Sequence, residues 1–265
     1  MEYKNIFIEL KNNKISRKEY INMARKKETS TATSTQTKPK KPRTTKAKPM
    51  ITAGDRECYI YFDTEFTGLR KNTSLISIGL VTSDGKTFYA EFTDYNKEFV
   101  DDWINENVIS NLVSPENVFN GDNWTMSGTS LEIREQLFEW LAPYKEQGKL
   151  IQFVSDVSHY DFVLLIDLLL GDEKLSAIDL PDGISPCCID VNQDIATSIQ
   201  RTKPEDVSEE EFNKNFVPAY AAFNFSREEM ISGVSNFKYE GNKHNSLYDA
   251  LVIRAIHQTL WNIEK

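Results

Sequence analysis

The sequence has little cysteine and no long apolar run. Its three cysteines are Cys58, Cys187 and Cys188, and the adjacent pair is poorly arranged for a disulfide. We therefore expect reduced thiols and no cysteine-based metal site. No apolar run approaches the ~20 residues of a membrane-spanning helix. Met1–Asn5 lacks the basic and apolar segments of a secretory signal. These absences predict a cytoplasmic protein that does not associate with membranes.

Basic residues are scarce beyond the first fifty positions. Residues 1–50 hold 14 Lys/Arg and 4 Asp/Glu, a net charge of +10, whereas the remainder holds 17 and 36, a net charge of −19. Phosphate binding requires clustered cations, so the acidic part is not expected to bind a broad duplex surface. An acidic domain can still act on nucleic acid if the chemistry is confined to a metal-lined pocket.

Composition divides the chain into three parts. Residues 1–28 form a short N-terminal segment in which Ser16 and Glu19 fit a capping box, which predicts a helix over about residues 17–26. Residues 29–54 are rich in Ser/Thr and then in Lys/Pro, which predicts a disordered basic linker. That linker is either a tether for nucleic-acid phosphates or a solvated spacer. Residues 55–265 have the composition of a globular domain.

Apolar periodicity in this domain indicates an α/β fold with a mixed sheet flanked by helices. Strands are expected at 58–63, 75–82, 86–93 and 150–154, and helices at 97–113, 127–141, 160–170 and 246–263. Pro143 lies beyond the expected end of the 127–141 helix. Residues 172–240 resist assignment and are either an insertion that covers substrate or peripheral packing.

Two carboxylates stand at the end of the first expected strand. Asp63 and Glu65 are two residues apart, so their side chains point to the same side of a strand. Two like charges so close require a shared proton or a cation, and a divalent metal with oxygen ligands is the common solution. Asp161 lies in the first turn of an apolar helix, where a helix-dipole role is the simpler interpretation. Asp156 is either the N-cap of that helix or a supporting group.

His244 and Asp249 open the last expected helix. Residues five apart lie about 140° apart on a helix of ~3.6 residues per turn, so the two side chains diverge if both are helical. They can converge if His244 lies in the preceding loop, with Asn245 or Ser246 as the N-cap.

Taken in order, these motifs resemble the histidine-bearing (DEDDh) branch of the DEDD 3′–5′ exonuclease superfamily. The resemblance is carried by Asp63-Thr64-Glu65, by Tyr160-Asp161, and by His244 with Asp249. The run from Phe62 to Leu69 with that from Leu75 to Val81 looks most like small bacterial and phage-type 3′–5′ exoribonucleases. The second motif of this family often begins with an Asn four or five residues before its Asp. Here Asp156 or Val157 stands there, a departure that concerns substrate contacts more than metal binding.

The resemblance implies a ribonuclease H-like fold and hydrolysis of single-stranded 3′ ends with release of nucleoside 5′-monophosphates. It implies that His244 is the general base and that two divalent ions, Mg²⁺ or Mn²⁺, are held by Asp63, Glu65, Asp161 and Asp249. Contacts with the terminal nucleotide are expected at Thr64, Phe66, Thr67 and Leu69.

Several alternatives remain open. RNA is favoured over DNA by the resemblance alone, so a 3′–5′ exodeoxyribonuclease with the same site is the alternative. A catalytically dead nucleic-acid-binding module is a further one, although all five motif positions are filled. Residues 1–28 could also mediate a homo-oligomer or bind a protein partner.

Overall fold

The computed structural model describes residues 57–171, 179–201, 208, 210, 222–224, 226–232, 237 and 239–261. The helix expected near residues 17–26 and the linker expected over 29–54 lie outside the described residues, as do the last two residues of the helix expected at 246–263. None of the helices in the described ranges combines the length and apolar content needed to cross a membrane.

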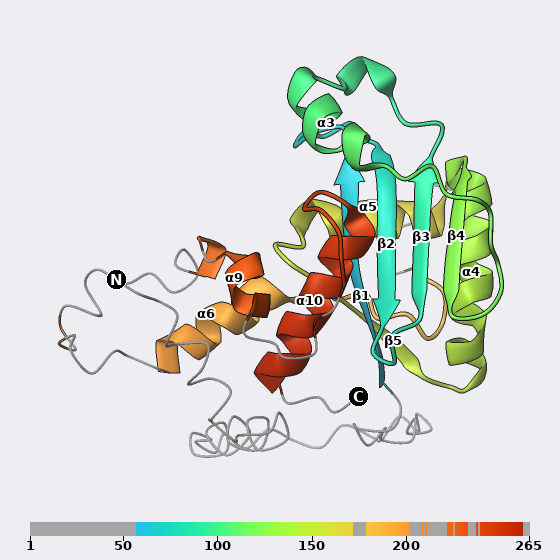
Figure 1. The fold of residues 1–265 in the computed structure, drawn as a ribbon. Coiled ribbons are helices and arrows are strands. Elements are labelled where there is room, and N and C mark those ends of the chain that lie inside the picture. Colours follow the sequence, from blue (N-terminus) through green and yellow to red (C-terminus); the bar gives the residue numbers. More distant parts are fainter. Residues whose placement is uncertain are drawn as a thin grey trace, which may run out of the picture.

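A six-stranded mixed sheet forms the centre of the domain (Figure 1). The strand order is β4-β3-β2-β1-β5-β6, in which β1 pairs antiparallel with β2 and parallel with β5. The strands are β1 (Glu57–Phe66), β2 (Leu75–Thr82), β3 (Thr87–Phe92), β4 (Asn123–Gly128), β5 (Leu150–Ser155) and β6 (Ile189–Asp190). A mixed sheet flanked by helices is the predicted fold class, which is thereby confirmed.

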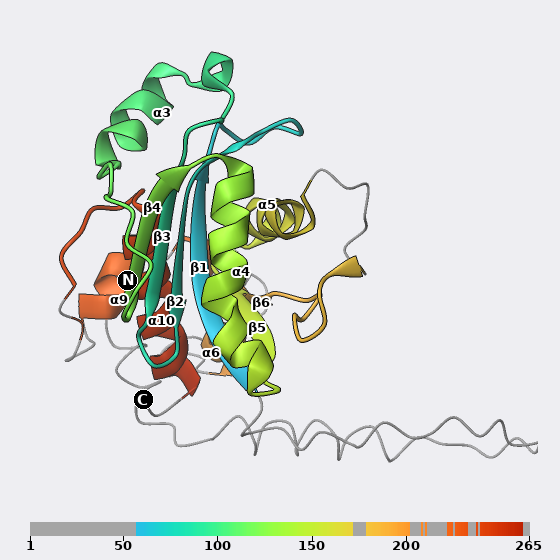
Figure 2. The ribbon, with the colours of Figure 1, turned by 90° about the vertical axis from the view of Figure 1, so that its right-hand side faces the viewer.

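Helices cover both faces of this sheet. On one face lie α4 (Ser130–Glu146) and α5 (His159–Leu170), and on the other lie α6 (Val191–Arg201), α9 (Arg227–Ser232) and α10 (Ser246–Trp261). Figure 1 shows α10 in front of the sheet and α5 behind it. In the view of Figure 2, α4 and α5 lie on one side of the sheet and α9 lies on the other.

The alternation of β1 decides which side chains meet each layer. Ile60 and Phe62 pack in the core beneath α4 and α5, whereas Tyr61 packs with α6 and α10. Asp63 and Glu65 continue the odd-numbered series, so the strand directs them toward the α10 face. The strand reaches Phe66 rather than the predicted residue 63, and it therefore includes the whole Asp-Thr-Glu motif.

The single helix expected at 97–113 is wrong. The segment instead contains η1 (Lys97–Phe99), α3 (Asp102–Asn107) and η2 (Ile109–Asn111). Val100 is extended and Asp101 starts a new helix by accepting a hydrogen bond from Ile104 N at 2.8 Å. As a result of this interruption, Ile104 and Val108 are buried, whereas Trp103 is 55% exposed.

The helix expected at 127–141 begins later and ends later than predicted. Residues through Gly128 form β4, which sequence patterning missed, and a capping box of Thr129 and Glu132 then starts α4. Pro143 lies inside α4 rather than beyond it. Burial of Tyr144 in the core stabilises the turn that follows, which offsets the backbone hydrogen bond that proline cannot donate.

The N-terminal turn of α10 lies unusually close to β2. A Cβ added at Gly79 would lie 2.4 Å from backbone atoms of Leu247 and Ser246, so only glycine permits this approach. The hydroxyl groups of Ser77 and Ser246 are 3.0 Å apart at the same contact. This packing fixes the first turn of α10 against the strand that neighbours β1.

Candidate active site

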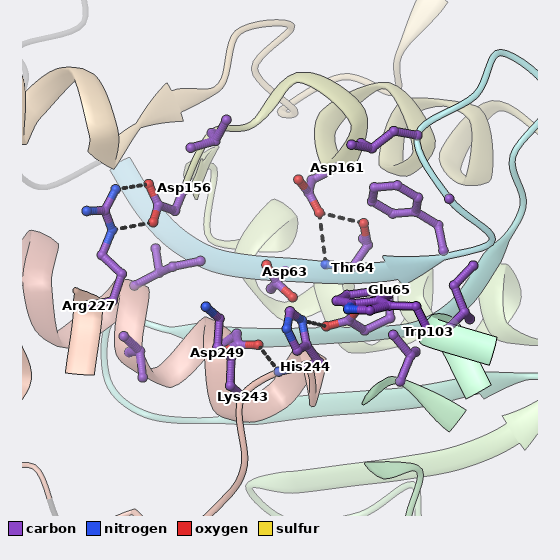
Figure 3. A pocket seen from close by; sticks show the side chains of 18 of the residues that line it. Asp63, Thr64, Glu65, Trp103, Asp156, Asp161, Arg227, Lys243, His244 and Asp249 are labelled. Carbon is purple, nitrogen blue, oxygen red and sulfur yellow. Dashed lines mark hydrogen bonds and ion pairs between the residues drawn. The ribbon is translucent and has the colours of Figure 1, made fainter. Parts of the chain in front are cut away.

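The end of β1, the first turns of α5 and α10, and the loop before α10 converge on one cavity of about 900 Å³ (Figure 3). It is lined by the five motif residues Asp63, Glu65, Asp161, His244 and Asp249. Strand β1 supplies the first two and α5 the third, the loop before α10 supplies His244, and the first turn of α10 supplies Asp249. Segments nearly two hundred residues apart in the chain therefore meet at one place.

Asp161 is joined to β1 through Thr64. Its Oδ1 accepts hydrogen bonds from Thr64 N at 3.1 Å and from Thr64 Oγ1 at 2.6 Å. Burial raises the pKa of Asp161, although these two hydrogen bonds favour its ionised form. The middle residue of the Asp-Thr-Glu motif thus aligns α5 with the strand that carries the other two carboxylates.

Burial and mutual repulsion disfavour the charged forms of the other three carboxylates. Burial raises the pKa of Asp63 well above its usual range, and the charges of Asp161, Asp249 and Glu65 raise it further. The pKa of Glu65 rises to about 8, mainly through burial and then through Asp249. The pKa of Asp249 rises to about 7, mainly through burial. Such concentrated negative charge is what a bound divalent cation would neutralise.

His244 lies in the loop before α10, which is the condition that the sequence set for its convergence with Asp249. Asn245 is the N-cap, because its Oδ1 accepts from Tyr248 N at 3.2 Å and its carbonyl accepts from Asp249 N at 3.0 Å. His244 has a φ of 64°, and its backbone N–H donates to Asp249 Oδ2 at 2.8 Å. The left-handed backbone therefore places the imidazole and the Asp249 carboxylate in the same cavity.

The imidazole of His244 lies between an acid and an aromatic ring. Its Nδ1 is 3.8 Å from Glu65 Oε1, and its ring centroid is 5.2 Å from that of Trp103 in an edge-on arrangement. Burial, and then the neighbouring Lys243, lower the pKa of His244. The ring is consequently neutral near pH 7 and can accept a proton.

Glu65, His244 and Asp249 offer ligand atoms within 4.8 Å of one another, the one such group among the described residues. This set differs from the predicted carboxylate set because it includes His244 and does not include Asp63 or Asp161. Asp63 and Asp161 line the same cavity (Figure 3). Carboxylate oxygens are the ligands that Mg²⁺ and Mn²⁺ prefer, so the donor set fits such ions.

Of the expected substrate contacts, Phe66 and Leu69 line the cavity. Leu69 is 78% exposed. The ring of Phe66 stacks on that of Tyr160, with centroids 5.5 Å apart and planes 17° apart. These apolar surfaces lie beside the carboxylates, where the base of a nucleotide could pack.

The two threonines are placed differently from what we expected. The hydroxyl of Thr64 is engaged by Asp161, although the residue lines the cavity. Thr67 is fully buried, and its Oγ1 accepts a hydrogen bond from Ser74 N at 3.0 Å. Thr67 is not among the residues lining the cavity, so its side chain stabilises the loop after β1.

Sequence reasoning missed three contributors to this cavity. Trp103 lies in the 97–113 segment, for which one helix was expected, and Asp101 is the capping residue that marks the break. Arg227 forms a bidentate ion pair with Asp156, at 2.5 and 2.9 Å. Asp156 is not the N-cap of α5, because Ser158 occupies that position. Phe223 is 58% exposed and also lines the cavity.

The chain is similar to known exoribonuclease domains over most of its described length. The family model described as "3'-5' exoribonuclease Rv2179c-like domain" matches residues 58–261. Two curated proteins of Mycobacterium tuberculosis are each 36% identical over 55 residues: 3'-5' exoribonuclease Rv2179c of strain H37Rv and 3'-5' exoribonuclease MT2234.1 of strain CDC 1551. These alignments cover 21% of this chain and 33% of each relative, so the chain spans about a third of their length.

Two solved structures are more distant. The RNase domain of the yeast Pop2 protein has a TM-score of 0.40 and 16% identity, over 77% of this chain and 76% of that one. The Neurospora crassa Pan2 catalytic unit has a TM-score of 0.37 and 15% identity, over 80% of this chain and 28% of that one.

Proposed function

Since the chain belongs to the family of Rv2179c-like 3′–5′ exoribonuclease domains, we propose that it is a metal-dependent 3′–5′ exoribonuclease. It hydrolyses phosphodiester bonds at single-stranded 3′ ends and releases nucleoside 5′-monophosphates. The observation that supports this proposal most is the convergence of four carboxylates and a neutral histidine on one cavity.

In this proposal two divalent cations, Mg²⁺ or Mn²⁺, are held by Asp63, Glu65, Asp161 and Asp249. Bound cations supply an activated water and neutralise the charge that develops on the phosphodiester. The raised pKa values of Glu65 and Asp249 support the assignment, because buried carboxylates resist ionisation unless a cation neutralises them. Thr64 holds the Asp161 carboxylate toward the other ligands through its two hydrogen bonds.

His244 is proposed as the general base that removes a proton from the attacking water. Its lowered pKa and half-buried position support this role, because a base must be unprotonated at working pH. The proximity of Nδ1 to Glu65 also makes a ligand role possible. The two roles differ in outcome: loss of a base slows turnover, whereas loss of a ligand weakens metal binding.

Substrate recognition is proposed to depend on exposed apolar side chains and one cation. Trp103 and Leu69 border the cavity beside His244 and the strand end, where they can stack against the unpaired bases of a single strand. Lys243 is exposed and lines the cavity, so its ammonium group can contact a phosphate. The family description supports RNA, and DNA remains the alternative substrate.

The test is degradation of matched, end-labelled RNA and DNA oligomers with Mg²⁺, Mn²⁺ or EDTA. We expect stepwise 3′–5′ shortening of RNA that requires a divalent ion, with Asp161→Asn inactive. Asp167→Asn is the matched control, because Asp167 is an exposed aspartate on the same helix. Turnover that persists in EDTA would refute the proposal. RNA binding without metal-dependent turnover would favour an inactive binding module, and preferential shortening of DNA would favour the exodeoxyribonuclease.

A further inference from the structure

Two charged residues from the unassigned connection reach the turn that leads to Asp161. That turn, residues 156–158, joins β5 to α5. Asp190 ends β6, which pairs in parallel with β5, and Arg227 begins α9. Neither residue belongs to the sequence motifs that identify the active site. Both contact the turn directly.

The turn is locally strained and lacks the usual helix cap. Val157 has a φ of 53°, a left-handed conformation that is uncommon for any side chain and an outlier for a β-branched one. Ser158 is the N-cap of α5, but its side chain makes no capping hydrogen bond. A strained turn of this kind persists only when surrounding contacts over-determine it.

Asp190 holds this turn from a neighbouring strand. Its Oδ1 accepts a hydrogen bond from Val157 N at 3.1 Å, and its Oδ2 accepts one from Ser158 N at 3.3 Å. Oδ1 also accepts from Asn192 N at 2.9 Å, which fixes the carboxylate at the start of α6. One side chain therefore satisfies both N–H groups at the strained entrance to α5.

Arg227 holds the same turn through its ion pair with Asp156 (Figure 3). Its Nε and Nη2 donate to Asp156, Nη2 also donates to Asn192 Oδ1 at 3.0 Å, and Nη1 donates to the Ala222 carbonyl at 2.7 Å. Because Nε, Nη1 and Nη2 all donate hydrogen bonds within the protein, the guanidinium is poorly placed to bind a substrate phosphate. It instead joins the turn, α6 and Ala222, the residue before the cavity-lining Phe223, into one unit.

We propose that Asp190 and Arg227 are positioning residues that clamp the 156–158 turn and thereby hold Asp161 where it can share a cation with the carboxylates of β1 and α10. The inference rests on the proposed function, since it concerns the same site. It assigns a role to part of the 172–240 connection: two of its described residues set the position of the Asp161 carboxylate.

The test measures metal affinity and turnover separately from stability. Asp190→Ala and Arg227→Met are compared with wild type by Mn²⁺ titration, by kcat for RNA at saturating Mn²⁺, and by thermal unfolding in EDTA. Loss of groups that orient metal ligands typically weakens metal binding by about 10- to 100-fold. We expect a loss of at least ~10-fold in Mn²⁺ affinity and a lower kcat in the folded proteins. Asp182→Asn and Glu229→Gln, exposed positions near each residue, should leave both unchanged.

Two further variants keep the test informative if an alanine or methionine variant fails to fold. Asp190→Asn retains the Oδ1 acceptor but loses the bond to Ser158, and Arg227→Lys keeps the charge but cannot form the bidentate pair. Both should show intermediate Mn²⁺ affinity. Val157→Gly, which adopts a positive φ freely, should partly restore Mn²⁺ binding when combined with Asp190→Ala.

The outcomes separate this inference from the proposed function. Folded variants with wild-type Mn²⁺ affinity and kcat but lowered melting temperature would overturn it, because the clamp would then be structural only. If the wild-type protein binds Mn²⁺ but does not shorten RNA, the proposed function fails, while the Mn²⁺ titrations still decide whether Asp190 and Arg227 position the ligand.

Discussion

Replacing Gly79 by alanine should displace α10 from the sheet and thereby pull the active site apart. The new Cβ would lie 2.4 Å from the Leu247 backbone, whereas ordinary contact begins at 3.4 Å, so a separation of about 1 Å is required. The obstructing atoms are backbone and cannot move by changing rotamer. Overpacking of this kind typically costs about 1–3 kcal/mol, and more when backbone must shift.

The same displacement of α10 would also move His244 and Asp249 relative to the carboxylates of β1. Gly79 is the cross-strand partner of Asp63, and Leu247 lies between His244 and Asp249. A shift of about 1 Å exceeds the ~0.5 Å within which catalytic groups must be held. Misplacement by ~1 Å can cost about 10²-fold in rate. We therefore expect a comparable loss of RNA turnover, with weaker Mn²⁺ binding.

The measurements are urea unfolding, Mn²⁺ titration and turnover of end-labelled RNA for Gly79→Ala and a matched control. Ser77→Ala is that control, because it removes the hydroxyl contact with Ser246 at the same interface without adding bulk. It should cost about 1 kcal/mol and leave turnover within a few fold. If Gly79→Ala matches wild type in stability, or if it is destabilised yet binds Mn²⁺ and cleaves RNA normally, the link between this packing and the site is wrong.

Three other predictions concern the carboxylates and the histidine. In EDTA the folded protein retains protons on Glu65 and Asp249 up to pKa values of about 8 and about 7, against ordinary values of 4.5 and 3.8 in the unfolded chain. Unfolding therefore releases protons in this window, the melting temperature should fall as pH rises through it, and Glu65→Gln should flatten the profile. An unchanged melting temperature would contradict the assigned burial. Thr64→Val should weaken Mn²⁺ binding by about 10-fold, because Asp161 loses the hydroxyl that orients it. Wild-type Mn²⁺ affinity in this isosteric variant would show that Thr64 does not position Asp161. For His244, with its positive φ, the asparagine variant should be more stable than the alanine variant in thermal unfolding. The asparagine variant should also lose about 10²–10⁴-fold in turnover at unchanged Mn²⁺ affinity, whereas lost affinity would identify a ligand instead of a base.

The parts of the site that follow local rules could be predicted from the sequence. Alternation along a strand places Asp63 and Glu65 on one side, and this holds in β1 whatever packs around it. The capping preference of Asn245 likewise places His244 outside α10. Both rules act over a few residues, so the local sequence is sufficient to apply them.

The parts that depend on distant contacts could not be predicted. Arg227 meets Asp156 across 71 residues, and no periodic pattern determines which charges will pair over such a separation. The spacing of apolar residues over 97–113, Trp103 among them, fits one face of a continuous helix. The break at Val100 rotates that face, and a tertiary contact with His244 then gives the exposed ring its position.

The alternation of β1 also limits how homologous chains can change in length. A residue inserted or deleted between Tyr59 and Glu65 would exchange the two faces of the strand, directing Thr64 toward α10 and the carboxylates into the opposite core. The register irregularity in the β1–β2 pairing falls after Glu65, between Glu65 and Phe66, where it leaves both carboxylates in phase. Insertions and deletions in related chains should therefore accumulate in the loop after Phe66 and in the 172–240 connection, and avoid the strand itself.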